Sequence, residues 1–487
     1  MHLTAARVVE LADAMDSKSI VLRDVRVRVP PRAWRRYPLR EERSAPVGGA
    51  RCALIDHVNN LKLQYLVELS KLGDHCAGLE TKLEAWLNEH DVIFDGQTIP
   101  FVLMPHFISP GQLRRVKHAV GALSAVLDRF CDAYPHDEAL REELAVSPME
   151  DSLIRIEPGF PRPMRICRLD AFLTGYDVKF LEFNADSPAG TGYTDILHAG
   201  LSSTIDLPRV RQEFDMAYTP ILPELIGTLT DAYGHIRAKH PDLPESPTLA
   251  LVDAEGSPSV PEFRIICSAA RATGLEALHC TLDDLRYDGS TLTAGGQPIQ
   301  LVYRRALLED LDQSDLVAAA RDGRVCVVNP FRSRVANNKK LFALFCDPRF
   351  RHLIHGDEQE VIDATIPWTR ILRDGRTNYG DWKIDLLPFV ADNRERLVLK
   401  PASDYGGHSV ALGMGRRRPS GTRSSTSTRP APISSSRSTC PSPRRCSRRS
   451  RTATSRCVSS ASTSTPSASE AVMPARSPVS RTEPSST

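Results

Sequence analysis

An abrupt change of composition near residue 415 is the feature that most constrains what this chain can fold into. Residues 416–487 contain no Leu, Phe, Tyr, Trp, His, Lys, Asp, Asn or Gln. A segment this poor in large apolar side chains cannot bury enough surface to offset the entropy of ordering its backbone. We therefore expect residues 415–487 to be a disordered tail, and the folded protein to be built from the residues before it.

The same break divides the charge of the chain. Residues 416–487 hold fourteen Arg and two Glu, a net charge of +12, whereas the whole chain carries +2, so the first 415 residues carry 2 − 12 = −10. An acidic body does not suggest nucleic acid as the natural partner. Two interpretations of the tail are open: a basic arm that binds nucleic acid, or translation of a GC-rich gene in a wrong frame. The abrupt loss of leucine favours the frameshift.

Length and composition suit a multidomain protein. With 487 residues and 41% hydrophobic content, the chain is long enough for two or three domains. It has no run of eighteen apolar residues and no secretory signal pattern, so we expect a cytoplasmic protein without a membrane partner. The eleven cysteines form no CxxC pair and no zinc-type spacing, which argues against a disulfide framework or a structural metal.

Hydrophobic periodicity divides the body into a helical part and an α/β part. Between residues 113 and 130 the apolar steps alternate three and four, which predicts a helix with Ser109 as N-cap and Pro110 in its first turn. Farther along, period-two segments alternate with helical ones, which predicts a layered α/β (α+β) arrangement. Strands are expected at 248–253, 300–303 and 325–328, and helices at 261–272 and 314–321.

Residues 165–186, RICRLDAFLTGYDVKFLEFNAD, predict two antiparallel strands joined by a turn at residues 174–177. If Leu173 pairs with Lys179, Asp170 faces Glu182, and all side chains two positions apart share a face. The polar face then gathers Arg168, Asp170, Glu182, Asn184 and Asp186. The opposite face is apolar and gathers Leu169, Ala171, Leu173, Leu181 and Phe183.

The polar face of this hairpin has two interpretations. Opposed carboxylates repel each other unless a positive group lies between them. Magnesium prefers one or two carboxylates with waters and phosphate oxygens, and an asparagine can complete its octahedron without adding charge. A solvated polar face without a ligand is the alternative.

A second segment, residues 396–410 (RLVLKPASDYGGHSV), has the form of a strand that delivers Lys400 and enters a glycine loop. Glycines allow backbone N–H groups to approach phosphate oxygens closely. Lys400 would hold an α- or β-phosphate, and Gly406 and Gly407 would close over a nucleotide. A strand that ends in an ordinary tight turn has a similar pattern.

These motifs resemble those of the glutathionylspermidine synthase family. The family signature GRxDF…KLLEYNADTP is similar to residues 167–172 and 179–188, CRLDAF and KFLEFNADSP. The resemblance implies that Asp170, Glu182 and Asn184 bind Mg²⁺ and that Arg168 neutralises the transferred phosphoryl group. Residues 335–342, VANNKKLF, are similar to the helix start SNKALL, which implies that Lys339 is the first ATP lysine. Residues 303–305 resemble a YRR feature that lies near the active site of related proteins.

The order of the motifs implies a circularly permuted ATP-grasp fold, because the metal carboxylates precede the lysines and glycine loop. The expected parts are an uncertain extension (1–52), a mainly helical region (53–160), a metal-binding part (161–245), an α/β subdomain (246–330), an incomplete nucleotide-binding part (331–414) and the tail (415–487).

The function that the resemblance implies is ATP- and Mg²⁺-dependent ligation of a small-molecule carboxylate to an amine or thiol through an acyl phosphate. We expect little turnover from this chain because the tail replaces the rest of the nucleotide-binding part. Two alternatives are a non-catalytic relative that binds nucleotide or a partner, and a nucleic-acid-binding protein that acts through the arginine-rich tail.

Overall fold

The computed structural model describes residues 49–73, 75–403, 410–413 and 456–460. The chain divides into two compact units. The first extends to Ile366 and includes residues 402–406, and the second contains residues 367–401 together with the chain from Gly407 onward. Most of the expected N-terminal extension and most of the tail lie outside the described residues.

The first unit begins with helices, as the periodicity predicts. In α4, Ser109 Oγ accepts a hydrogen bond from Gln112 N, and Gln112 returns one to Ser109 N, so the predicted N-cap is confirmed as a capping box. None of the helices within the described ranges is long and apolar enough to cross a bilayer. The helices before the hairpin are α2 (Gly49–Lys71), α3 (His75–Glu89), α4 (Pro110–Ala133), α5 (Glu138–Leu144) and α6 (Pro148–Ile154).

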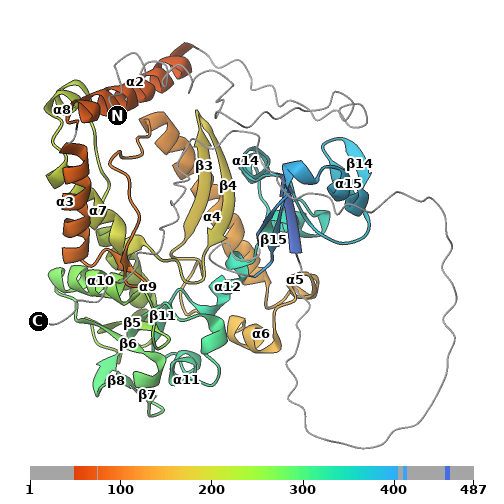
Figure 1. Cartoon of the computed structure of the whole chain (residues 1–487). Coiled ribbons are helices and arrows are strands. Elements are labelled where there is room, and N and C mark those ends of the chain that lie inside the picture. Colours follow the sequence, from red (N-terminus) through yellow and green to blue (C-terminus); the bar gives the residue numbers. More distant parts are fainter. Residues whose placement is uncertain (1–48, 74, 404–409, 414–455, 461–487) are drawn as a thin grey trace, which may run out of the picture. The chain divides into compact units, whose positions relative to one another are not determined.

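A four-stranded parallel sheet forms the α/β part of this unit, in the order β11-β10-β5-β6. Strands β5, β10 and β11 are mainly apolar and buried, as expected for strands of a parallel sheet. The strands and helices predicted for this part are confirmed. Helices α9 and α10 pack against it (Figure 1). The elements are β5 (Leu249–Asp253), β6 (Ala277–Thr281), β10 (Leu301–Arg304), β11 (Cys326–Val328), α9 (Leu222–Lys239), α10 (Val260–Ala272) and α11 (Asp315–Arg321).

The predicted hairpin forms from β3 (Arg168–Thr174) and β4 (Asp177–Asn184). Aromatic side chains pack the buried side of the hairpin against the rest of the unit. The rings of Phe183 and Phe342 contact each other edge-on, with 4.6 Å between centroids, and the rings of Phe130 in α4 and Phe345 lie 5.6 Å apart. The remaining elements of this unit are β1 (Ile93–Phe94), β2 (Gln97–Thr98), α7 (Thr191–Thr204), α8 (Pro208–Glu213), β7 (Leu285–Tyr287), β8 (Leu292–Ala294), β9 (Gln297–Ile299), α12 (Arg334–Asn337), α13 (Leu341–Leu344) and α14 (Glu358–Thr365).

The second unit contains a four-stranded antiparallel sheet in the order β12-β17-β15-β16 and a separate hairpin. One strand of the sheet comes from the tail, in which we expected no folded element. Backbone hydrogen bonds explain this difference, because a strand between two neighbours satisfies its polar groups whatever its side chains. The elements are β12 (Thr369–Ile371), β13 (Arg376–Tyr379), β14 (Trp382–Asp385), α15 (Leu386–Asp392), β15 (Leu397–Pro401), β16 (Ala411–Leu412) and β17 (Arg456–Ser460).

Helix α4 contains a buried acid that makes stability depend on pH. The Asp128 carboxylate accepts a hydrogen bond from Met164 N at 2.9 Å, and burial raises the pKa of Asp128 to about 6. A raised native pKa stabilises the fold at pH values below the unfolded pKa, and this contribution is lost as pH rises through 6. Relative to Asp128→Asn, which retains the acceptor, the wild-type free energy of unfolding should fall by roughly 2–3 kcal/mol between pH 4 and pH 7. Urea titrations at both pH values measure this difference, and a constant difference would contradict the prediction.

Candidate functional site

The hairpin register brings together the four side chains that the sequence predicts. Asp170 lies directly opposite Glu182, and Arg168 lies directly opposite Asn184. Cross-strand partners have Cβ atoms about 5 Å apart on one face, which is close enough to share a ligand. Both pairings confirm the register expected from the alternation of side chains.

A β-bulge follows this polar pair toward the turn. The register changes between Asp170 and Ala171, because Asp170 pairs with Glu182 whereas Ala171 pairs with Phe180. Leu181 is therefore an extra residue in β4. A bulge of this kind changes the phase of side-chain alternation and re-aims the residues beyond it.

The bulge corrects two expectations about the hairpin. Leu173 pairs with Val178 and not with Lys179. On the turn side of the bulge Val178 and Phe180 are buried, whereas beyond it Phe183 is buried. Of the expected apolar face only Phe183 is buried, and the others are half-buried or exposed: Leu169, Ala171, Leu173 and Leu181.

Two cations contact the paired carboxylates. Arg168 Nε lies 3.0 Å from Asp170 Oδ1, and Arg168 Nη1 donates to the Ala189 carbonyl at 2.9 Å. Lys339 Nζ lies 3.6 Å from Glu182 Oε2. Each carboxylate thus has one positive neighbour, which offsets part of their mutual repulsion.

Asn184 supplies an unpartnered polar atom at this face. Its Nδ2 atom is buried and has no hydrogen-bond partner among the described residues. A buried polar group without a partner costs roughly 1–3 kcal/mol. A terminal amide can present either its oxygen or its NH₂ group. This position therefore suits a ligand that accepts a hydrogen bond from the NH₂ group or a cation that binds the oxygen.

Asp186 does not join the polar face, contrary to expectation. Its side chain is only 2% exposed and is ion-paired with Arg304 and, at 3.2 Å, with Arg334. A buried carboxylate with two guanidinium partners is a structural group. The polar face therefore contains two carboxylates.

Residues 303–305 hold the loop that leaves the hairpin. Arg304 anchors Asp186, and Arg305 Nη1 lies 3.1 Å from Glu262 Oε2. The other oxygen of Glu262 accepts hydrogen bonds from Gly190 N and Gly192 N at 2.8 and 3.1 Å. These residues position the loop that accepts the hydrogen bond from Arg168. The part played by Glu262 has no local sequence signal.

The two adjacent lysines after α12 have different environments. Lys339 reaches Glu182, and its backbone N–H donates to the Ala402 carbonyl at 3.0 Å. Lys340 is buried, and its ammonium donates to the carbonyls of Glu143 and Leu144 at the end of α5. Only Lys339 belongs to the hairpin face.

The remaining predicted nucleotide contacts lie in the second unit or outside the described residues. Lys400 lies in β15 of the second unit. Gly406 and Gly407 lie outside the described residues. The structure thus gathers five of the predicted residues: Arg168, Asp170, Glu182, Asn184 and Lys339.

The donor set determines whether a metal ion fits. No group of three or more His, Cys, Asp or Glu side chains suited to a metal occurs within the part of the chain that is described. The two hairpin carboxylates and the Asn184 amide match what Mg²⁺ takes from a protein when waters and phosphate oxygens fill its other positions. The residues present therefore fit Mg²⁺ bound with a phosphate ligand better than a metal held by protein alone.

Comparison with known proteins gives distant likenesses of structure and no match of sequence. No protein-family model matches the chain, and no curated protein matches it. A glutathione synthetase-like effector from Globodera pallida, solved in its apo form, is similar over 67% of this chain and 74% of that chain, with a TM-score of 0.45 and 15% identity.

Proposed function

We propose that the polar face of the hairpin binds Mg²⁺ and the phosphates of ATP for a ligase that joins a carboxylate to an amine or thiol. The observation that carries this proposal is the pairing of Asp170 with Glu182 beside that of Arg168 with Asn184. Two carboxylates, an amide and nearby cations on one face form a donor set that suits a metal–phosphate complex.

Asp170, Glu182 and Asn184 would hold Mg²⁺, which supplies charge neutralisation to phosphate oxygens when it is bound. Arg168 would bind an oxygen of the transferred phosphoryl group, and its bond to the Ala189 carbonyl orients the guanidinium. Lys339 would offset the remaining negative charge.

The proposed reaction has two steps. A carboxylate oxygen of the substrate attacks the γ-phosphorus of ATP, and the bond to ADP breaks, which gives an acyl phosphate. An amine or thiol then attacks the acyl carbon, phosphate leaves, and the nucleophile loses a proton to solvent. Positioning and charge neutralisation supply most of the catalysis in such transfers.

The motif resemblance refines this proposal to a circularly permuted ATP-grasp ligase similar to glutathionylspermidine synthase. Lys400, Gly406 and Gly407 would contribute nucleotide contacts from the C-terminal side. A frameshifted tail would remove the rest of that part, so the proposal includes Mg²⁺-dependent ATP binding with little or no turnover.

Calorimetric titration of the full chain with ATP, with and without Mg²⁺, tests the proposal. We expect binding that requires Mg²⁺, and its absence would overturn the proposal. ADP release that requires both a carboxylate and an amine would show ligase activity in this chain. Binding with no ADP release after repair of the frame would favour a non-catalytic relative. A nucleic-acid affinity that is lost when residues 416–487 are removed would support the basic-arm alternative.

The adjacent lysines provide a matched test. Lys339→Met should weaken Mg²⁺-dependent ATP binding about tenfold, which corresponds to about 1.4 kcal/mol for one charge-assisted contact, and should leave stability unchanged. Lys340→Met should leave ATP affinity unchanged and lower the free energy of unfolding by about 1–3 kcal/mol, because two helix-end carbonyls lose their donor. Equal effects of the two substitutions on ATP affinity would remove Lys339 from the proposed site.

A further inference from the structure

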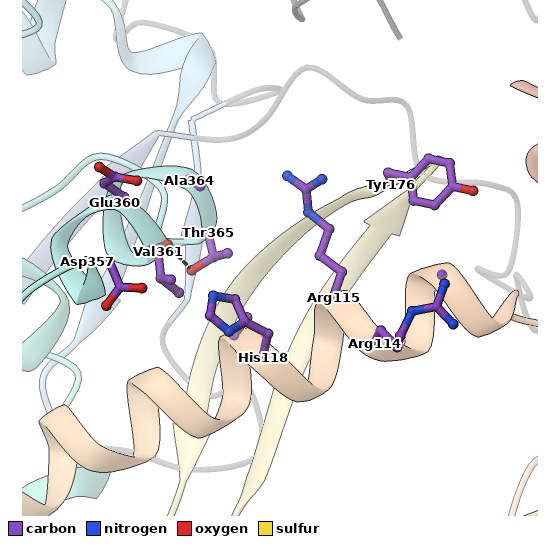
Figure 2. Close-up of a pocket in the computed structure, with 11 residues that line it drawn as sticks. Arg114, Arg115, His118, Tyr176, Asp357, Glu360, Val361, Ala364 and Thr365 are labelled. Carbon is purple, nitrogen blue, oxygen red and sulfur yellow. Dashed lines mark hydrogen bonds between the residues drawn. The ribbon is translucent and has the colours of Figure 1, made fainter. Parts of the chain in front are cut away.

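A cleft of about 510 Å³ lies between α4, α14 and the turn of the hairpin (Figure 2). Its lining within the described residues includes none of the predicted site residues. Thr174, at the turn end of β3, is four residues from Asp170, or roughly 13 Å along an extended strand. The cleft is therefore distinct from the carboxylate pair.

The two helical walls of the cleft carry opposite charges. Gly111, Arg114, Arg115 and His118 lie at positions i, i+3, i+4 and i+7 of α4, so they share one face. Figure 2 shows acidic side chains on the other wall, where Asp357 and Glu360 come from the start of α14. Apolar side chains line the space between: Ala119, Val361 and Ala364.

Direct contacts fix the α4 wall to the hairpin turn. The Gln112 amide donates to the Gly175 carbonyl. A Cβ at Gly111 would lie 3.1 Å from Tyr176 Cε1, so glycine permits this close approach of the helix to the turn. Tyr176 closes one end of the cleft (Figure 2).

The α14 wall is fixed in the same way. Lys179 Nζ donates to the Ala364 carbonyl at 2.8 Å, which attaches the end of α14 to β4. Arg129 of α4 is ion-paired with Glu358 and donates to the Leu353 carbonyl at 2.7 Å. Both walls are held in place, so the opening between them belongs to the fold.

The charged side chains of the cleft do not pair with one another. Arg114, Arg115, His118, Asp357 and Glu360 have no side-chain hydrogen bond or ion pair with any residue for which coordinates are described. Elsewhere in the same unit, facing charges on adjacent elements do pair, as Arg129 and Glu358 do. Charges of opposite sign therefore line the two walls without pairing, which leaves room for a ligand that meets both.

We propose that this cleft binds a zwitterionic small molecule whose anionic and cationic groups are separated by a short aliphatic spacer. Arg114 and Arg115 contact the anionic group, since guanidinium groups bind carboxylates well. Asp357 and Glu360 contact the ammonium group, and the spacer lies against the apolar floor. An ω-amino acid or a short peptide has this chemistry. The inference does not rest on the proposed ligase function.

Titration of the full chain with 4-aminobutanoate, 6-aminohexanoate and 8-aminooctanoate, followed by calorimetry at low salt, tests the inference. We expect saturable binding of at least one of them. Hexanoate and hexylamine, which each lack one charge, should bind at least tenfold more weakly. Absence of saturable binding across the series would overturn the inference, as would equal affinity for hexanoate, which would indicate a plain anion site.

Neutral, nearly isosteric variants locate the binding. The pair Arg114→Gln and Arg115→Gln, and separately the pair Asp357→Asn and Glu360→Gln, should each weaken binding of the best probe at least tenfold. Lys117→Gln is the matched control, because Lys117 is an exposed cation of α4 outside the cleft. Far-ultraviolet circular dichroism and urea midpoints check that each variant folds, and unchanged affinity in a folded variant pair would overturn the assignment.

Discussion

Replacing Arg304 with methionine is expected to lower the free energy of unfolding by roughly 3–5 kcal/mol, because it strips a buried carboxylate of its closest partner. Arg304 is fully buried and ion-paired with Asp186. It also donates to the carbonyls of Ala306 at 2.7 Å and Asn329 at 3.1 Å. All three acceptors lose a charged donor in the variant.

Urea denaturation of wild type and variant measures this loss. Arg324→Met is the matched control, because Arg324 pairs with the exposed carboxylate of Asp242, and an ion pair of this kind contributes far less than a buried one. Adding Asp186→Leu to Arg304→Met should recover part of the stability, since it removes the stranded charge. A cost of Arg304→Met no larger than that of the control would contradict the structural role of this pair.

The double substitution Asp170→Asn and Glu182→Gln is expected to weaken Mg²⁺-dependent ATP binding at least about a hundredfold. Changes to groups that merely support metal ligands already cost 10–100-fold in affinity, and this change removes both carboxylates of the proposed site. Stability should be unchanged or slightly higher, because facing carboxylates repel each other across the strands.

Calorimetry with Mg²⁺ and ATP measures the affinity, and urea midpoints check the fold. Asp177→Asn is the matched control, since it removes an exposed carboxylate from the turn end of the same hairpin. ATP affinity that survives the double substitution would place the nucleotide elsewhere. A loss shared with the Asp177 variant would indicate an effect of net charge alone.

Local periodicity was enough to predict much of the hairpin and of the α/β part. The alternation of polar and apolar side chains within one segment was enough to predict that Asp170 lies opposite Glu182. Ser109 and Pro110 correctly predicted the start of α4. The bulge at Leu181 was missed because strict alternation has no signal for an extra residue.

Contacts distant in sequence explain the other differences. Asp186 continues the alternation of polar residues along β4, so the sequence places it on the polar face. Its side chain instead pairs with Arg304 and Arg334, which lie 118 and 148 residues away in sequence. Likewise, nothing local distinguishes Lys339 from Lys340. Tertiary packing alone assigns one ammonium to the hairpin and the other to the end of α5.

Asn329 links the two ends of the hairpin. Its amide accepts a hydrogen bond from Ile166 N at 3.0 Å and donates to the carbonyls of Ile166 and Ala185 at 2.6 and 2.7 Å. The chain just before β3 and just after β4 is thus fastened by a residue that follows β11, more than 140 positions later. The hairpin therefore does not form an independent structural unit. A chimaera that exchanges residues 165–186 alone would keep its carboxylates and lose a matched Asn329, whose hydrogen bonds hold the two ends of the hairpin together. Recombination between relatives would have to carry the segment from Arg165 through Asn329 as a block.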